Sequence, residues 1–166
     1  MITKLIIDSH FRIGGAIGTG LQVANCPANA DASCTGGAML LHLTTTASAY
    51  IENVWLWIAD HDIDDANNTQ INVLVPRGML IESTQALWMY GTASEHALLY
   101  QYQFYQASTI LAGMIQTESP YYQPGIAPPG PFGGFLGTFN GDPTFNVSNC
   151  GIDAQGKRIS SIFDSI

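Results

Sequence analysis

Short apolar stretches alternate with polar bends along the first two-thirds of the chain. The stretches are rich in β-branched and aromatic residues, and Gly, Asn, Ser or Thr separates most of them. They cover residues 39–45, 49–58, 71–75, 78–82, 86–90, 97–104 and 109–115. None of them sustains the 3.6-residue apolar period of an amphipathic helix. The pattern therefore predicts an all-β protein.

The ends of these predicted strands favour stacking in a solenoid over pairing in hairpins. Asn-Gly is a strong hairpin signal, but Asn140-Gly141 lies outside the strand series. Several strands end instead in similar polar segments, "LIES", "TASEH" and "QTES". Like residues recur in this way when short strands stack coil upon coil, so we predict a parallel β-helix. A β-sandwich remains the alternative.

Composition divides the chain into three regions. Residues 1–124 carry the strand series and are expected to form one partial β-helix domain. Residues 125–150 begin with "GIAPPGPFGG", which holds too much Pro and Gly for a strand ladder and predicts a surface loop. Residues 151–166 are polar and are expected to form a divergent or truncated tail.

The bulk composition limits the classes of function. The chain has 166 residues, 46% hydrophobic and 11% charged, which is enough apolar material for one well-buried domain. Its 13 Asp and Glu against 5 Lys and Arg give a net charge of −8, which repels phosphate backbones and argues against a nucleic-acid partner. No apolar run reaches the roughly 18 residues of a membrane span, so no membrane partner is expected.

The cysteines and the glycosylation sequons indicate a secretory environment. Cys26 and Cys34 lie close together in "CPANADASC", which suits a local disulfide, with two free thiols as the alternative. Cys150 is then left over. Asn67 and Asn146 begin N-glycosylation sequons. The start "MITKLIID" is too short and too quickly interrupted for a signal peptide, so we expect that a preceding segment is missing.

Two glutamates are the most informative candidates for chemistry. Glu95 and Glu118 lie 23 residues apart (118 − 95 = 23), and both stand at strand boundaries. Solenoid coils repeat every ~20 to 45 residues, so the two acids are expected at equivalent corners of adjacent coils. Two close carboxylates do not both ionise easily, and glycoside hydrolysis uses one protonated and one ionised carboxyl group. The alternative is two exposed acids at coil corners.

Aromatic side chains are dense around the two acids. Alternate strand residues share a face, so Trp55 and Trp57 are expected to point together, and flat aromatic faces suit sugar rings. For Trp55, Trp88 and Tyr100 we expect a place in the core or in aromatic stacks inside the solenoid. Tyr121 follows a proline in a predicted turn and is expected outside the core.

Other chemistries find less support in the sequence. The acidic run from Asp60 to Asp65 lacks the Gly and Glu of an EF-hand, so we expect no metal and no cofactor. Ser94 and His96 flank Glu95, but neighbours in a strand face opposite ways, and no G-x-S-x-G elbow is present. The glycines of "RIGGAIGTG" lack the following helix of a dinucleotide site.

Four long motifs carry a resemblance to a known family: "SAYIENVWLWIADHDIDD", "RGMLIES", "LWMYGTASEHALLYQYQF" and "GMIQTESPYYQP". They are similar to the C-terminal half of fungal exo-β-1,3-glucanases of glycoside hydrolase family 55, and the match runs from about Phe11 to Pro124. The resemblance implies two tandem right-handed parallel β-helices with the active site between them, this chain being part of the second. It also implies a secreted enzyme that cuts β-1,3-glucan (laminarin) from the chain end with inversion.

The resemblance also implies roles for individual residues. Glu118 in "QTESPYY" would be the general acid, and Glu95 in "TASEH" would help to hold the nucleophilic water. The side chains of Trp57, Asp60 and Tyr121 would contact the glucose ring at the cleavage site.

The departures from the family matter equally. The family has a complete first β-helix before this segment, which supplies a Gln and a Ser that position the water, and neither can be placed here. We therefore expect a fragment that holds half of an active site. The competing hypothesis is a truncated, non-catalytic solenoid that at most binds glucan. A pectate lyase would need a calcium-binding acid cluster with a basic residue nearby. The chain has only three arginines, Arg12, Arg77 and Arg158, which makes this class a poor match.

Overall fold

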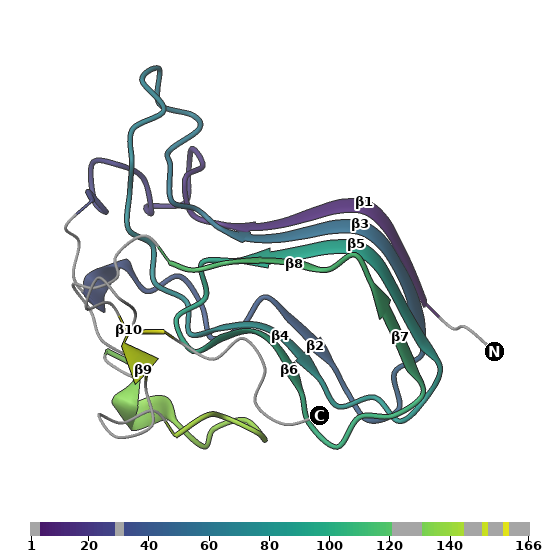
Figure 1. Cartoon of the computed structure of the whole chain (residues 1–166). Coiled ribbons are helices and arrows are strands. Elements are labelled where there is room, and N and C mark those ends of the chain that lie inside the picture. Colours follow the sequence, from purple (N-terminus) through teal and green to yellow (C-terminus); the bar gives the residue numbers. More distant parts are fainter. Residues whose placement is uncertain (1–3, 29–31, 121–130, 145–150, 153–157, 160–166) are drawn as a thin grey trace.

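The computed structural model describes residues 4–28, 32–120, 131–144, 151–152 and 158–159, and within them β-strands joined by loops are the main regular structure, with two short 3₁₀ helices, η1 and η2 (Figure 1). The elements are β1 Lys4–Ile13, η1 Ala32–Cys34, β2 Leu41–Leu43, β3 Ala49–Ile58, β4 Arg77–Ile81, β5 Leu87–Glu95, β6 Tyr100–Phe104, β7 Ile110–Gly113, β8 Gln116–Glu118, η2 Gly133–Phe135, β9 Gly151–Ile152 and β10 Arg158–Ile159. No helix among the described residues is long and apolar enough to cross a membrane.

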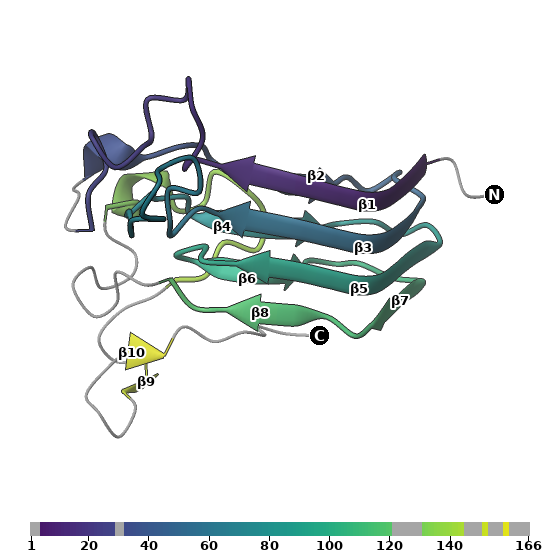
Figure 2. The ribbon, with the colours of Figure 1, turned by 90° about the horizontal axis from the view of Figure 1, so that it is seen from above.

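Two parallel sheets form the body of the chain. One sheet has the order β1-β3-β5, with β7 and β8 both pairing with β5, and the other has the order β2-β4-β6. Figure 2 shows β1, β3, β5 and β8 lying side by side in the same direction. Each strand therefore pairs with its equivalent one coil later, which confirms the predicted partial parallel β-helix. A hairpin-built sandwich would need antiparallel ladders in these sheets.

The strand predictions missed β1, β8, β9 and β10 and placed one strand where the structure has none. β1, a ten-residue strand, was not predicted, because its apolar residues are interrupted by Asp8 and Ser9. The predicted strand over residues 71–75 is instead an extended segment with isolated bridges, from Ile71 to Pro27 and from Leu74 to Thr35. Its residues are all buried, so the apolar run indicates the core correctly but not a ladder.

A bend at the same position of each coil gives the solenoid its shape. Asp8 in β1, Asn53 in β3 and Gly91 in β5 have φ values of 48°, 51° and 61°, and Met114, between β7 and β8, has 52°. This left-handed region suits Asn, Asp and Gly. The Asn53 Nδ2 donates a hydrogen bond of 2.6 Å to Asp8 Oδ1, so the bends of adjacent coils are tied together.

The core lies between the two sheets. It brings together fully buried side chains from both: Leu43, Ile51, Leu56, Met79, Ile81, Leu87, Met89 and Tyr102. Each such apolar side chain contributes about 1.5–3 kcal/mol by leaving water. The Tyr102 hydroxyl donates a 3.0 Å hydrogen bond to Thr92 Oγ1, which satisfies a polar group inside this core. The core fixes the outward-facing side chains of β3, β5 and β8, which carry the site.

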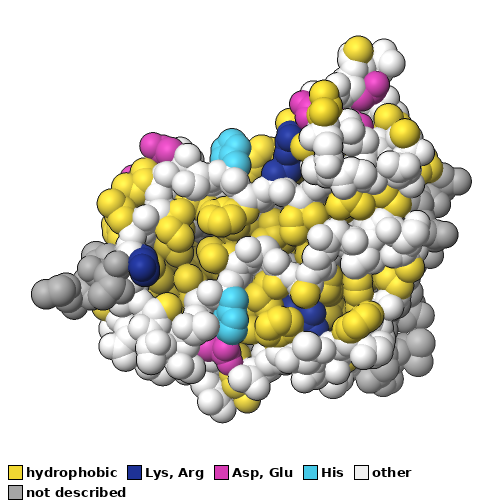
Figure 3. All heavy atoms as spheres, turned by 180° about the vertical axis from the view of Figure 1, so that it is seen from behind, with side chains coloured by type: hydrophobic (Ala, Val, Ile, Leu, Met, Phe, Trp, Pro, Cys, Tyr) yellow, Lys and Arg dark blue, Asp and Glu magenta, His cyan; other side chains and the backbone are white. Residues whose placement is uncertain are grey.

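The β1 end of the solenoid presents apolar side chains to solvent. In the described part of the chain, β1 pairs with β3 and has no partner on its other edge. Leu5 and Ile7 of β1 are exposed, at 67% and 40%. Figure 3 shows hydrophobic side chains gathered across the middle of the face seen from behind.

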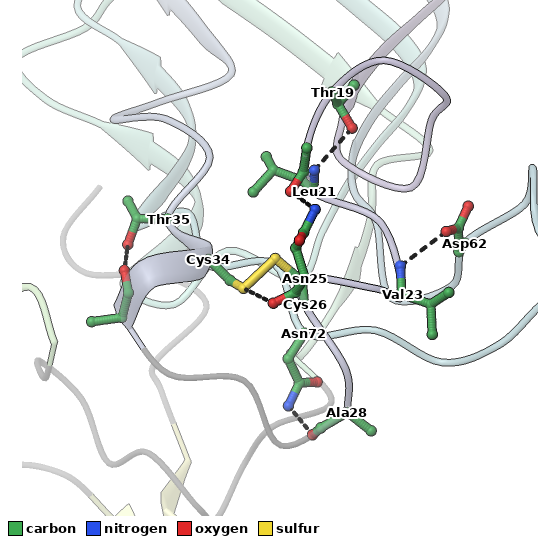
Figure 4. The surroundings of a disulfide bond; sticks show 12 residues. Thr19, Leu21, Val23, Asn25, Cys26, Ala28, Cys34, Thr35, Asp62 and Asn72 are labelled. Carbon is green, nitrogen blue, oxygen red and sulfur yellow. Dashed lines mark hydrogen bonds between the residues drawn. A yellow bond between two sulfur atoms is a disulfide. The ribbon is translucent and has the colours of Figure 1, made fainter.

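Two long loops leave the same end of the strands and are fastened to each other. Cys26 and Cys34 form a disulfide, with Cα atoms 5.7 Å apart, in the first loop (Figure 4). Asp62, in the second loop, accepts a 3.0 Å hydrogen bond from the backbone N–H of Val23. Asn72 also donates to the carbonyl oxygen of Ala28. The acidic run therefore supports loop structure through Asp62.

A buried ion pair holds residues 131–144 against the second sheet. The guanidinium of Arg77, at the start of β4, donates from Nε to Asp142 Oδ1 at 2.6 Å and from Nη2 to Asp142 Oδ2. It also donates to the carbonyl oxygens of Phe135 and Ala38, and it lies 4.9 Å from the centroid of the Phe139 ring. Part of the predicted Pro/Gly-rich loop is thus a packed cover.

Candidate active site

The two glutamates predicted from the 23-residue spacing are direct neighbours across the sheet. Glu95 ends β5, Glu118 ends β8, and the register pairs these two residues. The same register pairs Glu95 with Trp57 of β3, and Trp57 with Arg12 of β1. Successive coils therefore place Glu118, Glu95, Trp57 and Arg12 in one column at the carboxyl ends of parallel strands. The candidate site is built around this column.

Glu95 is held rigidly from both sides. The residue is only 6% exposed. Its Oε2 accepts a 2.7 Å hydrogen bond from the indole Nε1 of Trp55, and its Oε1 accepts a 2.8 Å hydrogen bond from the side-chain amide of Gln116. These donors come from the coils before and after it, because Trp55, Ala93 and Gln116 share a register column. Hydrogen bonds to both oxygens fix the orientation of this carboxyl group.

Glu118 has the opposite environment. Its side chain is 47% exposed, and its Oε1 lies 3.7 Å from the Nε2 of His96. Its backbone carbonyl accepts a 2.9 Å hydrogen bond from the His96 N–H. The main chain is therefore anchored while the carboxyl group reaches solvent. One acid is fixed and nearly enclosed, and the other is accessible to a substrate.

Asp60 lies behind the two glutamates. It is nearly buried, its Oδ2 lies 2.8 Å from His61 Nδ1, and its Oδ1 lies 4.0 Å from His96 Nδ1. Asp60 thus lies beside His96, next to Glu95 and Glu118, and its implied contact with the glucose ring stays a prediction. Tyr121 lies outside the described residues.

An aromatic cleft adjoins the acids on the β1 side. Trp55 and Trp57 stack with ring centroids 5.0 Å apart and an interplanar angle of 29°. Together with His10, Arg12 and Ile63 they line a cleft of about 280 Å³. A stacked indole pair beside hydrogen-bonding groups is a surface suited to the flat apolar faces of sugar rings.

His96 was assigned differently from the sequence, and Trp55 in part. Trp55 was expected in the core or in a stack inside the solenoid, and it does stack on the buried Trp57 and pack against a core cluster, but it also donates a hydrogen bond to Glu95. His96 was set aside because strand neighbours face opposite ways. It lies beyond the end of β5 with φ of 69°, so strand alternation no longer applies and its ring contacts Glu118. Gln116 was missed as well, and only the coil register identifies it.

Two further expectations concern residues around the site. Tyr100 is buried, as expected for a core residue, whereas Trp88 is only partly buried. Asn67 lies exposed in the loop after β3, so its sequon stays a prediction, and Asn146 and Cys150 lie outside the described residues.

Glu95, His96 and Glu118 also form a group that can hold a metal ion. One ligand atom from each lies within 4.8 Å of the other two. Two carboxylates and an imidazole are ligands that zinc accepts in proteins. Both oxygens of Glu95 already accept hydrogen bonds, however, and these donors would have to share the carboxylate with an ion.

The distance between the two carboxyl groups relates to whether hydrolysis inverts or retains the configuration of the anomeric carbon. The nearest oxygens of Glu95 and Glu118 lie within 4.8 Å. Inverting glycosidases separate their two carboxyl groups by roughly 6.5–9.5 Å to admit water, and retaining enzymes by roughly 5–5.5 Å. The side-chain positions seen here are thus closer together than a direct inverting pair. Glu118 is the more exposed of the two, with a side chain that is 47% exposed.

Comparison with known proteins places the chain among fungal relatives. No family model matches it. It is 53% identical over 122 residues to a probable glucan endo-1,3-β-glucosidase of Arthroderma benhamiae, covering 70% of this chain and 14% of that protein. It is 47% identical over 156 residues to a glucan 1,3-β-glucosidase of Cochliobolus carbonum, covering 92% of this chain and 19% of that protein.

A third relative carries a different name. The chain is 50% identical over 141 residues to the non-secreted LysM effector LysM15 of Penicillium expansum, covering 83% of this chain and 10% of that protein. The chain therefore spans between 10% and 19% of the length of these three relatives.

Proposed function

We propose that this chain, which is homologous to one segment of fungal β-1,3-glucanases, carries the two acidic residues of a β-1,3-glucan hydrolase site, Glu95 and Glu118. The observation that supports this most is the direct register of Glu95 and Glu118, one rigid and one accessible, beside stacked indoles. Hydrolysis of a glycosidic bond requires a proton donor that reaches the leaving oxygen and a group that orients water.

Glu118 is the proposed general acid. Its proton passes to the glycosidic oxygen while the bond from that oxygen to the anomeric carbon breaks. Water adds to the anomeric carbon from the opposite face, and Glu95 helps to hold this water through its fixed carboxylate. The proton that the water loses restores the protonation of the site, so the net change is addition of one water. Inversion at a β-linkage releases the α-anomer of glucose.

Trp57, Asp60 and Tyr121 are the proposed contacts of the glucose ring at the cleavage site. Trp57 is 7% exposed and stacks on Trp55 in the wall of the cleft, and Asp60 offers carboxylate oxygens to sugar hydroxyls. We further propose attack from the chain end and membership of glycoside hydrolase family 55. In the relatives, groups outside the matched segment would add to the site, because that segment is only 10% to 19% of each relative.

A secreted protein is part of the same proposal. The disulfide between Cys26 and Cys34 suits an oxidising compartment. Asn67 in its exposed loop and Asn146 are the proposed glycosylation sites.

Release of glucose from laminarin tests the proposal. The purified chain should release α-glucose, observed by proton NMR before mutarotation, and Glu118→Gln should reduce the rate by about 10²- to 10⁴-fold. Glu52→Gln is the matched control, because Glu52 lies on β3 and accepts a hydrogen bond from Tyr50 away from the column. Initial β-glucose would instead indicate a retaining enzyme, and undiminished release by Glu118→Gln would exclude Glu118 as the acid.

A non-catalytic glucan-binding solenoid is the second candidate. The small share of each relative that the chain covers favours it, because one side of a site holds sugar more easily than it completes catalysis. Laminarin binding without glucose release, with binding weakened by Trp57→Ala, would support this candidate.

A further inference from the structure

We propose that Asn140 is a site of spontaneous deamidation by water, and that the carboxylate formed there loosens the cover that residues 131–144 make over the second sheet. The Asn140-Gly141 dipeptide lies outside the strand series, and the proposed hydrolase site uses neither residue. The inference is therefore independent of the proposed function, and its test needs no measurement of glucan hydrolysis.

Asn140 and Gly141 are the two central residues of a tight turn. The backbone N–H of Asp142 donates a 3.4 Å hydrogen bond to the carbonyl oxygen of Phe139. Asn140 is exposed, so water reaches its side chain. The Gly141 N–H forms no hydrogen bond within the described part of the chain. The backbone nitrogen next to the Asn140 side chain is therefore available to react.

The fold requires glycine at position 141. Its φ of 70° lies in the left-handed region, which favours glycine. A Cβ atom at this position would lie 2.7 Å from Tyr105 Cδ2 and 3.1 Å from Gln103 Nε2, so any other residue would clash with the end of β6. A side chain here would also shield the backbone nitrogen. Packing thus keeps the one residue that leaves the nitrogen after Asn140 unshielded.

The carboxamide of Asn140 is itself part of the structure. Its Nδ2 donates a 2.7 Å hydrogen bond to Glu82 Oε1, and Glu82 Oε2 lies 2.6 Å from His42 Nε2. The Glu82 side chain is only 11% exposed. Asn140 thus supplies a donor to a nearly enclosed carboxylate and links the segment 131–144 to the residue that follows β4.

Deamidation exchanges the amide nitrogen of Asn140, a chemically labile residue type, for an oxygen from water. The Gly141 nitrogen attacks the side-chain carbonyl carbon, and the bond from that carbon to the amide nitrogen breaks. Ammonia leaves with the proton of the Gly141 nitrogen, and a cyclic imide remains. Water then adds to one of the two imide carbonyl carbons and opens the ring, which gives aspartate or isoaspartate. Over both steps one water is consumed and one ammonia is released.

The product replaces a hydrogen-bond donor by a second acceptor beside Glu82. An ionised carboxylate has no hydrogen to donate, so Glu82 Oε1 loses its partner, and two like charges face each other where solvent screens them poorly. The turn also lies directly before Asp142, which forms the ion pair with Arg77. Deamidation therefore breaks one of the links that fasten the cover and leaves the ion pair to hold it.

Peptide mapping by mass spectrometry tests the proposal on the folded chain. During incubation in mildly alkaline buffer, Asn140 should lose its amide faster than Asn53 and Asn68, which are also exposed and also have positive φ but precede Val54 and Thr69. Isoaspartate in the product is identified by the methyl group that it accepts from an isoaspartyl methyltransferase. Asn140→Gln should stay intact at this position, because glutamine would have to close a larger ring.

Urea unfolding of Asn140→Asp tests the structural consequence. Loss of the hydrogen bond and gain of a like charge should lower the folding equilibrium constant by about 5- to 30-fold. Gln106→Glu makes the same exchange of amide for acid at an exposed residue after β6, and it is the matched control. It should change the constant by less than about threefold.

Three results would overturn the proposal. Asn140 might keep its amide in the folded chain while the urea-unfolded chain deamidates, which would mean that the turn protects the site. Deamidation at Asn53 or Asn68 as fast as at Asn140 would mean that the following glycine confers no reactivity. A folding equilibrium constant unchanged in Asn140→Asp would break the link between deamidation and the cover.

Discussion

Two carboxylate–histidine pairs, one on each sheet, show how similar residues serve structure in one place and chemistry in another. On the second sheet, His42 Nε2 lies 2.6 Å from Glu82 Oε2, and Asn140 donates to Glu82 Oε1 at 2.7 Å. On the first sheet, His96 Nε2 lies 3.7 Å from Glu118 Oε1, and the Glu118 side chain is 47% exposed. The Glu82 side chain is 11% exposed.

The surroundings of the two pairs explain the difference. Residues 131–144 cover the second sheet, and the Arg77–Asp142 ion pair fastens them there, so both oxygens of Glu82 have partners within the fold. No such cover lies over Glu118 in the described part of the chain. A carboxylate with all its partners in place stabilises the fold, whereas an accessible one beside a fixed second acid can exchange a proton with a substrate.

The largest expected effect on stability lies in the cover. Arg77→Met removes the cation of a buried ion pair and leaves Asp142 as an uncompensated charge, which should lower the free energy of unfolding by about 3–5 kcal/mol. Urea unfolding measures this. Glu118→Gln, on the exposed side of the comparison, should change the same free energy by less than about 0.5 kcal/mol. Equal losses of free energy of unfolding in Arg77→Met and Glu118→Gln would contradict the view that the covered side serves structure and the exposed side serves chemistry.

The second expected effect concerns the rigid acid. Trp55→Phe keeps an aromatic ring but removes the indole N–H that donates to Glu95. Loss of one charge-assisted hydrogen bond of about 1.5–3 kcal/mol should lower kcat on laminarin by about 10- to 100-fold if Glu95 must be held in place. Trp88→Phe, on β5, is the control. A kcat unchanged by Trp55→Phe would mean that the orientation of Glu95 does not limit the reaction.

The third expected effect is a loss of stability at high pH through Tyr102, in the core beneath the site. Burial raises the pKa of Tyr102 to about 12 from its ordinary value of 10.0. The stability from a neutral buried Tyr102 is fully present below pH 10 and is lost as the pH rises through about 12. Between pH 9 and pH 11 the chain should lose about 1 kcal/mol through this group. Tyr102→Phe should flatten this part of the stability curve, and an unchanged slope would contradict the assignment.

The smallest expected effect belongs to Glu82. Hydrogen bonds from Asn140 and His42 hold the pKa of Glu82 below its ordinary value of 4.5, although burial opposes this. The stabilisation is therefore present above pH 4.5 and is lost as the pH falls through the lowered pKa. Acid unfolding of Glu82→Gln should be less steep there, by less than about 1 kcal/mol. A steeper acid limb in Glu82→Gln would reverse the sign of this argument.

The sequence was sufficient to predict the fold class and the central pair of the site. Repeated strand ends and the 23-residue spacing of Glu95 and Glu118 are consequences of coil stacking, and the register pairs these residues directly. Such periodic features survive in the sequence because every coil must place like residues at like positions.

The contacts that the sequence did not predict depend on departures from the regular repeat of the coils. His96 faces Glu118 because its φ of 69° breaks the strand alternation. A histidine in the sequence does not predict a positive φ. Trp55 donates to Glu95 from the preceding coil, a relation that appears only once the register is known. Asp142 lies 65 residues from Arg77, in a segment whose Pro and Gly content indicates only a loop.

Comparison of two substrates in one variant tests the central claim, that Glu118 is the general acid, most directly. A dinitrophenyl β-glucoside has a leaving group that departs without protonation, whereas laminarin needs an acid. Glu118→Gln should lose laminarin hydrolysis by about 10²-fold or more and should retain most of its hydrolysis of the dinitrophenyl glucoside. Equal loss on both substrates, or no loss on laminarin, would contradict the assignment of Glu118 as the proton donor.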